Sequence, residues 1–350
     1  MSTLLAYNFT NNDLHKHIIN KLYESGVHKE SETYKALSSE PMDILISGFL
    51  IAAGLLLGFS LSFLGAALAV AGVWTFSNHF LGRQSLFAAF IPKKSFTNIS
   101  GHILGENNRH IIILTKGYEP ADGINHLNQL SFRRFLIIYF CINLFSIPWA
   151  YLGEYHQGKV FYLIISLSLI LVQVCFMSYY LWKRKPGEQR EFSGISILLD
   201  LIDRMAKTGL KKFNIHFLIS DGRERGIVGA RNYYEKIESK IHPGNSYVIN
   251  LLNQFNDHIK YFTGEGILQY RQSNSALVNK CSAIASQSHY PEIQAAEQRV
   301  KLMDSLIFTQ NDYPCITISG RSGAENDDIL QADKISADFV YELIKQITTQ

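Results

Sequence analysis

The sequence predicts an α/β protein with a mixed, mostly parallel sheet that is flanked by helices and interrupted by two apolar helical hairpins. Short β-rich runs alternate with runs in which apolar residues have helical spacing, which is typical of a sheet covered on both faces. Three long stretches contain no Asp, Glu, Lys or Arg. Only 18% of the 350 residues are charged and the net charge is +3. This composition excludes a disordered chain, a coiled coil and a typical nucleic-acid binder.

The polar segments supply the expected strands and covering helices. Residues 12–25 show helical spacing of apolar side chains and are followed by Gly26, a common helix terminator. Ser336 is a plausible N-cap for a closing helix over 337–347. Ligands of such sheets lie at the carboxyl ends of the strands. The other expected elements are helices at 193–207 and 226–239 and strands at 98–104, 110–116, 212–220, 247–252 and 315–319.

The three uncharged runs cover residues 44–76, 135–153 and 160–182. About 20 apolar residues cross a bilayer as a helix, so the second and third runs are each expected to be one transmembrane span. The first run is too long for one span, and Gly58 and Gly65 near its middle favour a hairpin of two short helices. A buried core helix is the alternative, but core helices rarely continue this far without a charged residue.

The distribution of basic residues predicts the orientation in the membrane. Arg133 and Arg134 precede the second hairpin and three basic residues follow it at 183–185, whereas the turn 154–159 carries one. Both outer ends of this hairpin are therefore expected in the cytoplasm. If the first run is also a hairpin, all the polar mass lies on that side. We expect an integral membrane protein whose soluble domain faces the cytoplasm.

The expected organisation alternates soluble and transmembrane segments. No ionisable residue lies inside the uncharged runs, which disfavours a channel or a pump. The five expected segments are 1–42 (N-terminal helix of the soluble domain), 43–77 (first hairpin), 78–133 (first part of the α/β domain), 134–183 (second hairpin) and 184–350 (main part of the α/β domain).

Common catalytic motifs are absent from the sequence, including a Walker loop, GxGxxG, GxSxG and HExxH. What stands out is a series of segments in a fixed order. The most specific is Asp-Gly-Arg-Glu-Arg-Gly-Ile-Val-Gly-Ala at 221–230. The others are 98–104, 110–120, 187–194, 247–252, 304–308, 313–318 and 333–335.

This series resembles the co-catalytic zinc aminopeptidases, a zinc-dependent exopeptidase family that includes glutaminyl cyclases and the non-peptidase relatives transferrin receptor, nicastrin and nicalin. The resemblance covers roughly residues 10–39 and 95–348, and it implies an aminopeptidase-like fold. In the family, an aspartate and a water bridge two zinc ions, each of which also has a histidine and a carboxylate ligand. A glutamate is the general base, and the metals lower the pKa of the water.

The positions that the family uses for zinc and for the general base are mostly altered in this sequence. The first histidine position is Gly117, and Glu119 keeps a carboxylate at the position that orients it. The bridging aspartate corresponds to Arg190 and the general base to Arg223. Two guanidinium groups there would repel a metal pair by several kcal/mol even at an effective dielectric constant of about 20.

The remaining ligand positions give little compensation. Glu224 is kept, Leu252 replaces an aspartate, and the last histidine corresponds to a loop near Asn326. A shift of one residue would place Glu191 at the bridge, but the other changes would remain. The resemblance therefore implies a degenerate site with no bound metal, and zinc is expected only if the site has been rebuilt.

The altered crevice suggests other uses. Arg190 and Arg223 could bind an anion, since arginine donates a fork of hydrogen bonds to carboxylate or phosphate. Alternatively, the two arginines pair with Glu191 and Glu224 and fill an abandoned site. The second hairpin is inserted between the segments that border this crevice, so the crevice should open close to the bilayer surface.

Three functions follow as hypotheses. The first is a catalytically inactive, membrane-anchored scaffold or binding module that recognises a membrane protein or peptide and no nucleic acid. The second is an active membrane-bound metallo-aminopeptidase or related hydrolase with an atypical site. The third is a protein that binds anions or lipid headgroups through Arg190 and Arg223.

Overall fold

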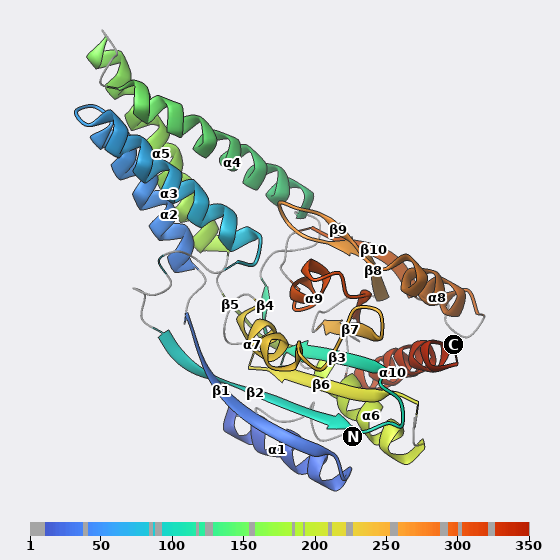
Figure 1. The fold of residues 1–350 in the computed structure, drawn as a ribbon. Helices are drawn as coiled ribbons and strands as arrows, with labels where there is room; N and C mark the ends of the chain where they lie inside the picture. Colours follow the sequence, from blue (N-terminus) through green and yellow to red (C-terminus); the bar gives the residue numbers. More distant parts are fainter. Residues whose placement is uncertain are drawn as a thin grey trace.

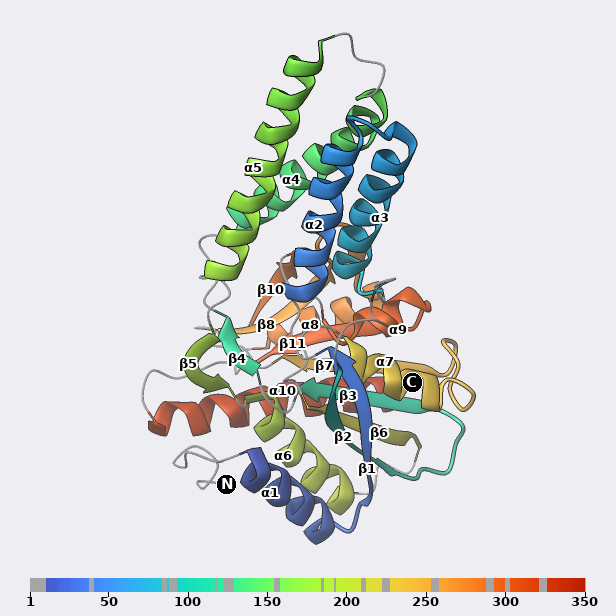
Figure 2. The same cartoon turned by 90° about the vertical axis from the view of Figure 1, so that its left-hand side faces the viewer.

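The fold combines a large sheet with a bundle of four apolar helices (Figures 1 and 2). The computed structural model describes residues 11–37, 41–83, 87, 93–116, 119–122, 129–153, 158–183, 186–191, 193–208, 212–221, 227–252, 258–287, 293–299, 303–320 and 326–349. The helices are α1 (Asn11–Glu24), α2 (Pro41–Leu57), α3 (Ser62–Phe80), α4 (Gln129–Leu152), α5 (Lys159–Lys183), α6 (Ser193–Thr208), α7 (Val228–Ile237), α8 (Ser275–Ala285), α9 (Leu306–Gln310) and α10 (Asn326–Thr348). The strands are β1 (His28–Leu37), β2 (Lys93–Ile103), β3 (His110–Lys116), β4 (Glu119–Asp122), β5 (Pro186–Glu191), β6 (Asn214–Ser220), β7 (Ser246–Leu252), β8 (Ile259–Glu265), β9 (Arg271–Gln272), β10 (Ile293–Gln298) and β11 (Cys315–Ser319).

The large sheet is mixed, which confirms the predicted fold class. Its strands lie in the order β1-β2-β6-β3-β7-β11-β8-β10, and β9 pairs with β8. The four central strands β6, β3, β7 and β11 are parallel to one another. The antiparallel pairs are β1 with β2, β2 with β6, β11 with β8 and β8 with β9. Strands β4 and β5 form a separate two-stranded sheet.

Both faces of the central sheet are buried. On β3, Ile111 and Ile113 join an apolar cluster with side chains of α1, α6, α8 and α10, whereas Ile112 and Leu114 join a second cluster with α7 and α9. Figure 2 shows α1 and α6 below the sheet and the helical bundle above it. Continuous apolar runs such as the one in β3 are typical of parallel strands that are covered on both sides.

The uncharged runs form two helical hairpins, as predicted. α2 and α3 are joined by the turn 58–61, and α4 and α5 follow each other after β4. Three helical segments are long and apolar enough to cross a membrane, namely Ser62–Phe80, Arg133–Leu152 and Lys159–Tyr179, and Met42–Leu57 is a shorter apolar helix. Many large apolar side chains on these helices are exposed, including Phe63 and Val160.

The first hairpin depends on glycine for close packing. A Cβ atom on Gly54 would lie 2.5 Å from the carbonyl oxygen of Gly65, and one on Gly65 would lie 2.5 Å from the amide nitrogen of Gly58. Both contacts are with backbone atoms, which cannot move aside independently of the helix. The small residues therefore allow α2 and α3 to approach more closely than side chains would permit.

The end of α3 is fixed to the sheet domain. Phe80 is buried in the same apolar cluster as side chains of α7 and α9. The Nε2 group of Gln310 donates a hydrogen bond to the carbonyl of Leu81 at 2.8 Å, and the Arg231 guanidinium donates to the carbonyl of Gly82. The bundle and the sheet therefore share one apolar core.

Several boundaries differ from the predictions. The closing helix α10 begins at Asn326, and Ser336 is buried within it, so its prediction as the N-cap was wrong. The segment 1–42 contains β1 besides the expected α1. β1 has the sequence His-Lys-Glu-Ser-Glu-Thr-Tyr-Lys-Ala-Leu. Among the strands that the structure describes it pairs with β2 alone, so as a charged edge strand it lacks a strong apolar pattern. The elements β4, β5, β8, β9, β10, α8 and α9 were also not predicted.

Four histidines form a row across neighbouring strands. His28 pairs with His102 in the register of β1 and β2, and His102 pairs with His216 in that of β2 and β6. The Nδ1 atom of His110 on β3 lies 3.0 Å from Nε2 of His216. Burial lowers the pKa of His216 to about 4, and the neighbouring histidines act in the same direction.

The row should make the fold sensitive to acid. Between pH 6.5 and about 4 the unfolded chain binds a proton at residue 216 that the folded chain excludes, so stability falls as the pH falls through this range. His216→Gln should remove about 2 kcal/mol of the loss between pH 7 and pH 5. Chemical unfolding of the detergent-solubilised chain at both pH values measures this. An unchanged pH slope would contradict the prediction, and His242→Gln, at an exposed position, is the control.

The close glycine contacts of the first hairpin predict that a larger side chain there lowers the stability of the bundle. Gly65→Ala should force α2 and α3 apart and lower the stability of the bundle by about 1–3 kcal/mol. The midpoint of thermal unfolding in detergent measures the loss. Gly244→Ala is the matched control, since a Cβ at Gly244 meets only the His242 side chain at 3.4 Å. Equal midpoints for the two variants would show that the close approach is not needed.

Candidate functional site

The carboxyl ends of the parallel strands meet at one edge of the sheet. β3 ends at Lys116, β6 at Ser220, β7 at Leu252 and β11 at Ser319. The small β4–β5 sheet lies at the same edge, because residues 117–118 alone separate β4 from β3. This edge is where the topology places a ligand site, and it is where the segments of the motif series converge.

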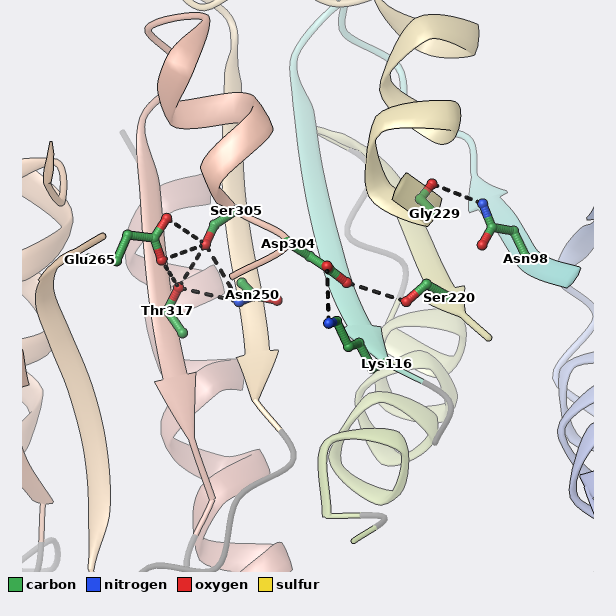
Figure 3. Close-up of polar contacts among 9 residues, drawn as sticks. All are labelled: Asn98, Lys116, Ser220, Gly229, Asn250, Glu265, Asp304, Ser305 and Thr317. Carbon is green, nitrogen blue, oxygen red and sulfur yellow. Dashed lines mark hydrogen bonds and ion pairs between the residues drawn. The ribbon is translucent and has the colours of Figure 1, made fainter. Parts of the chain in front are cut away.

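A buried carboxylate lies at the centre of this edge. The Asp304 side chain is 1% exposed, and its Oδ1 atom lies 3.8 Å from the Nζ atom of Lys116 (Figure 3). The Ser220 hydroxyl donates to Oδ2 of Asp304 at 3.3 Å. A lysine at the end of β3 and a serine at the end of β6 therefore both reach the same carboxylate.

The next residue along the chain anchors a second polar network. The Ser305 hydroxyl is 2.9 Å from both carboxylate oxygens of Glu265, which ends β8, and 3.0 Å from the hydroxyl of Thr317 on β11. Asn250 on β7 donates through Nδ2 to the Thr317 hydroxyl at 3.3 Å. All four side chains are buried. Figure 3 shows the two networks side by side, joined by Asp304 and Ser305.

Glu265 is a strongly perturbed acid of this region. Burial raises the pKa of its carboxyl to about 7, and the hydrogen bonds from Ser305 and Thr317 oppose this rise. A carboxyl group with such a pKa exchanges its proton near neutral pH. Because the group is buried, it acts within the protein core and has no direct contact with solvent.

The ends of the 221–230 turn are fixed to β2. The backbone amide of Thr97 donates to Oδ2 of Asp221 at 3.1 Å, and Nδ2 of Asn98 donates to the carbonyl of Gly229 at 3.0 Å. The most specific motif of the sequence therefore begins and ends at the same strand. Arg223 and Glu224, which lie between these anchors, are outside the described residues.

Three predicted site residues lie in the small sheet. In the antiparallel register of β4 and β5, Glu119 is opposite Glu191, and Arg190 is opposite Pro120. The backbone thus brings Glu119, Glu191 and Arg190 together beside the carboxyl edge. Their side chains are outside the described part of the structure, so the predicted pairing of Arg190 stays a prediction.

Three further predicted ligand positions are Leu252, Gly117 and Asn326, and the structure describes no metal-binding side chain at any of them. Leu252 ends β7 in an apolar cluster with Phe262 and Met303. Gly117 lies outside the described residues, and Asn326 begins α10 with a side chain that is not described.

The described residues of the carboxyl edge do not fit a pair of zinc ions. Among all the residues that the structure describes, no group of three or more His, Cys, Asp or Glu side chains is arranged to hold a metal. The buried carboxylate of Asp304 already faces the ammonium group of Lys116. A metal ion at this carboxylate would be repelled by that ammonium group.

Sequence reasoning found part of this site. Asp304 lies in a segment of the motif series, but its contacts with Lys116 and Ser220 were not predicted. Asn250 could have been noticed as a polar residue inside the apolar run of β7. Glu265 gave no comparable signal, because β8 was not predicted.

The buried network predicts a gain in stability on removal of the Glu265 charge. With a pKa of about 7 in the folded chain and 4.5 ordinarily, Glu265 costs stability as the pH rises from 4.5 to 7. Glu265→Gln keeps the shape and is always neutral, so the variant should exceed the wild type by up to about 3 kcal/mol at pH 8 and should match it near pH 4.5. Unfolding of both proteins at these pH values measures the difference.

The control for this prediction is Glu297→Gln on β10. The Arg299 guanidinium holds the pKa of that exposed carboxyl below its usual range, so its neutralisation should not stabilise the chain at pH 8. A Glu265→Gln variant that loses stability at pH 8 would contradict the prediction.

Comparisons with known proteins bear on this fold. Residues 191–343 match the model of peptidase family M28. No curated protein matches the chain significantly. Among solved structures, the glutaminyl cyclase of Macrostomum lignano has 10% identity and a TM-score of 0.47, with 97% of this chain and 84% of that chain covered. The glutaminyl cyclase of Porphyromonas gingivalis has 10% identity and a TM-score of 0.45, with 94% and 86% covered.

A Zn-dependent exopeptidase from Parabacteroides distasonis has 9% identity and a TM-score of 0.45, with 97% of this chain and 90% of that chain covered. The match of residues 191–343 to peptidase family M28 thus confirms the resemblance to zinc aminopeptidases that the motif series predicted.

Proposed function

We propose that this chain is a membrane-anchored, aminopeptidase-like protein that acts without catalysis, as a scaffold or binding module whose domain faces the cytoplasm. The observation that carries this proposal is the Lys116–Asp304 pair at the carboxyl edge of the sheet. At this edge a zinc peptidase needs several anionic or imidazole ligands. Here a buried carboxylate is instead neutralised by a lysine of the same chain.

The electrostatics argue against metal-assisted hydrolysis. A divalent ion loses hydration on binding and needs several ligands to replace it. Among the family positions, Gly117 and Leu252 supply no ligand and Arg190 carries the opposite charge. Glu224 keeps a carboxylate at a ligand position, and Glu119 keeps one only at the orienting position. One ligand carboxylate cannot offset the lost hydration of a metal pair.

The bundle supports membrane anchoring with one orientation. A Cβ atom on Gly153 would lie 2.5 Å from the carbonyl oxygen of Gly58, so the turns of the two hairpins lie side by side at the end away from the sheet. The described turns carry one basic residue, Lys159, at that end. Arg133 and Arg134 lie at the opposite end, at the start of α4. By the positive-inside rule, this distribution of basic residues supports a sheet domain in the cytoplasm.

The position of the bundle favours a partner at the membrane surface. α5 is followed by β5 after residues 184–185, and β5 lies at the carboxyl edge of the sheet. A ligand of this edge therefore approaches beside the lipid headgroups. A membrane protein or a membrane-proximal peptide fits this position best, and an anion held by Arg190 and Arg223 is the alternative.

Metal content separates this proposal from an atypical hydrolase. The detergent-purified chain should contain no stoichiometric zinc by elemental analysis and should give no heat in a calorimetric zinc titration. About two tightly bound zinc ions per chain would overturn the proposal and would favour an active peptidase. Arg190→Asp together with Arg223→Glu restores two family residues, and it serves as the comparison because any gain of zinc would come from those positions.

A further inference from the structure

Three arginines lie at the end of the bundle that adjoins the sheet domain, and we refer to them as the arginine collar. Arg83 follows α3 after Leu81 and Gly82, and Arg133 and Arg134 lie near the start of α4. Arg83 and Arg134 are exposed, and Arg133 is half-buried. Within the described residues, none of the three forms an ion pair.

Helix packing places Arg83 and Arg133 at the same end of the bundle. α3 and α4 run antiparallel, and Phe76 of α3 contacts Tyr139 and Phe140 of α4, with ring centroids 5.2 and 6.1 Å apart. α3 ends at Phe80, and the chain then turns, with the backbone amide of Arg83 donating to the carbonyl of Asn78 at 2.8 Å. Arg133 lies seven residues before Phe140 on α4. Both arginines therefore lie on the sheet side of the contacts that Phe76 makes with α4.

The acids near the collar already have other partners. Asp43 at the start of α2 lies 3.6 Å from the His79 imidazole. Glu297 on β10 lies 2.7 Å from Arg299, and Arg133 is only a weaker contributor to the lowered pKa of Glu297. The collar thus keeps positive charge that the described protein groups do not neutralise.

A second positive group, Arg231, lies close to Arg83. Arg231 on α7 is half-buried, and its guanidinium is occupied by the carbonyl of Gly82. Burial lowers the pKa of Arg231, the negative charge of Glu235 opposes this, and the positive charge of Arg83 lowers the pKa further. The guanidinium groups of Arg83 and Arg231 repel each other where the apolar bundle ends. An anion bound at this position would reduce the repulsion.

We propose that the arginine collar binds the phosphate groups of anionic phospholipids in the leaflet next to the sheet domain. Headgroup phosphates lie where the apolar helices end, and arginine matches phosphate with two parallel hydrogen bonds. This inference rests on the proposed membrane anchoring. It uses a different set of residues from the crevice arginines Arg190 and Arg223.

The test uses the full chain in nanodiscs of phosphatidylcholine with increasing fractions of phosphatidylglycerol. Phosphatidylglycerol should raise the midpoint of thermal unfolding of the wild-type chain. Each single change, Arg83→Gln, Arg133→Gln or Arg134→Gln, should raise the half-saturating lipid fraction about fivefold. The triple variant should lose the response. Its matched control, with Lys16→Gln, Lys207→Gln and Lys212→Gln, removes the same charge from exposed sites of the sheet domain and should keep it.

The outcomes distinguish a failure of lipid binding by the arginine collar from a failure of the membrane anchoring on which this proposal rests. A wild-type chain that stays out of the nanodisc overturns the anchoring and this surface together. An inserted chain without a response to phosphatidylglycerol, or an equal loss in the control variant, overturns the surface alone. Inorganic phosphate at matched ionic strength should not stabilise the chain in pure phosphatidylcholine, and an equal shift there would show a site for free anions instead.

Discussion

The apolar core that the helical bundle shares with the sheet is the constraint on which the rest of this structure depends. Phe76 and Phe80 of α3 belong to the same cluster as Ile112 and Leu114 of β3. Burying each such side chain contributes roughly 1.5–3 kcal/mol, so the bundle and the sheet are not independent bodies on a flexible linker. Any ligand at the carboxyl edge of the sheet must therefore be reached beside the bundle.

The segment at Asp304 and Ser305 connects this shared core with the candidate site. Asp304 contacts the ends of β3 and β6 through Lys116 and Ser220, whereas Ser305 contacts Glu265. α9 follows directly and packs its apolar residues into the shared core. One short stretch of chain therefore contributes both to the two polar networks and to the apolar core that the bundle shares with the sheet. Such a buried polar connection favours a single arrangement of its elements, because each partner left unpaired would cost about 1–3 kcal/mol.

The charges of the molecule divide into two kinds with different roles. Lys116 and Asp304 neutralise each other inside the domain, so they leave little charge for a ligand. Arg133 and Arg134 near the start of α4 form no ion pair among the described residues, and they lie where the apolar segment of that helix begins. This contrast is why we propose a non-catalytic crevice and, separately, a surface for anionic lipids.

The sequence by itself determined the class of the fold, the two helical hairpins and the strands with strong apolar patterns. β3 and β11 agree with the predicted ranges because their runs are buried on both faces, and the family resemblance followed from the motif at 221–230. Only the tertiary structure decided which polar groups meet. Glu265 and Thr317 are far apart in the chain, so no local sequence pattern predicts their contact. The edge strand β1 has a charged sequence, so no apolar pattern predicts that strand either. Helix α10 likewise begins before the predicted N-cap, and Ser336 is buried within it, so the tertiary structure overrides its local preference for a helix start. Local patterns record which side chains avoid water, whereas pairing between distant residues depends on the packing of the whole chain.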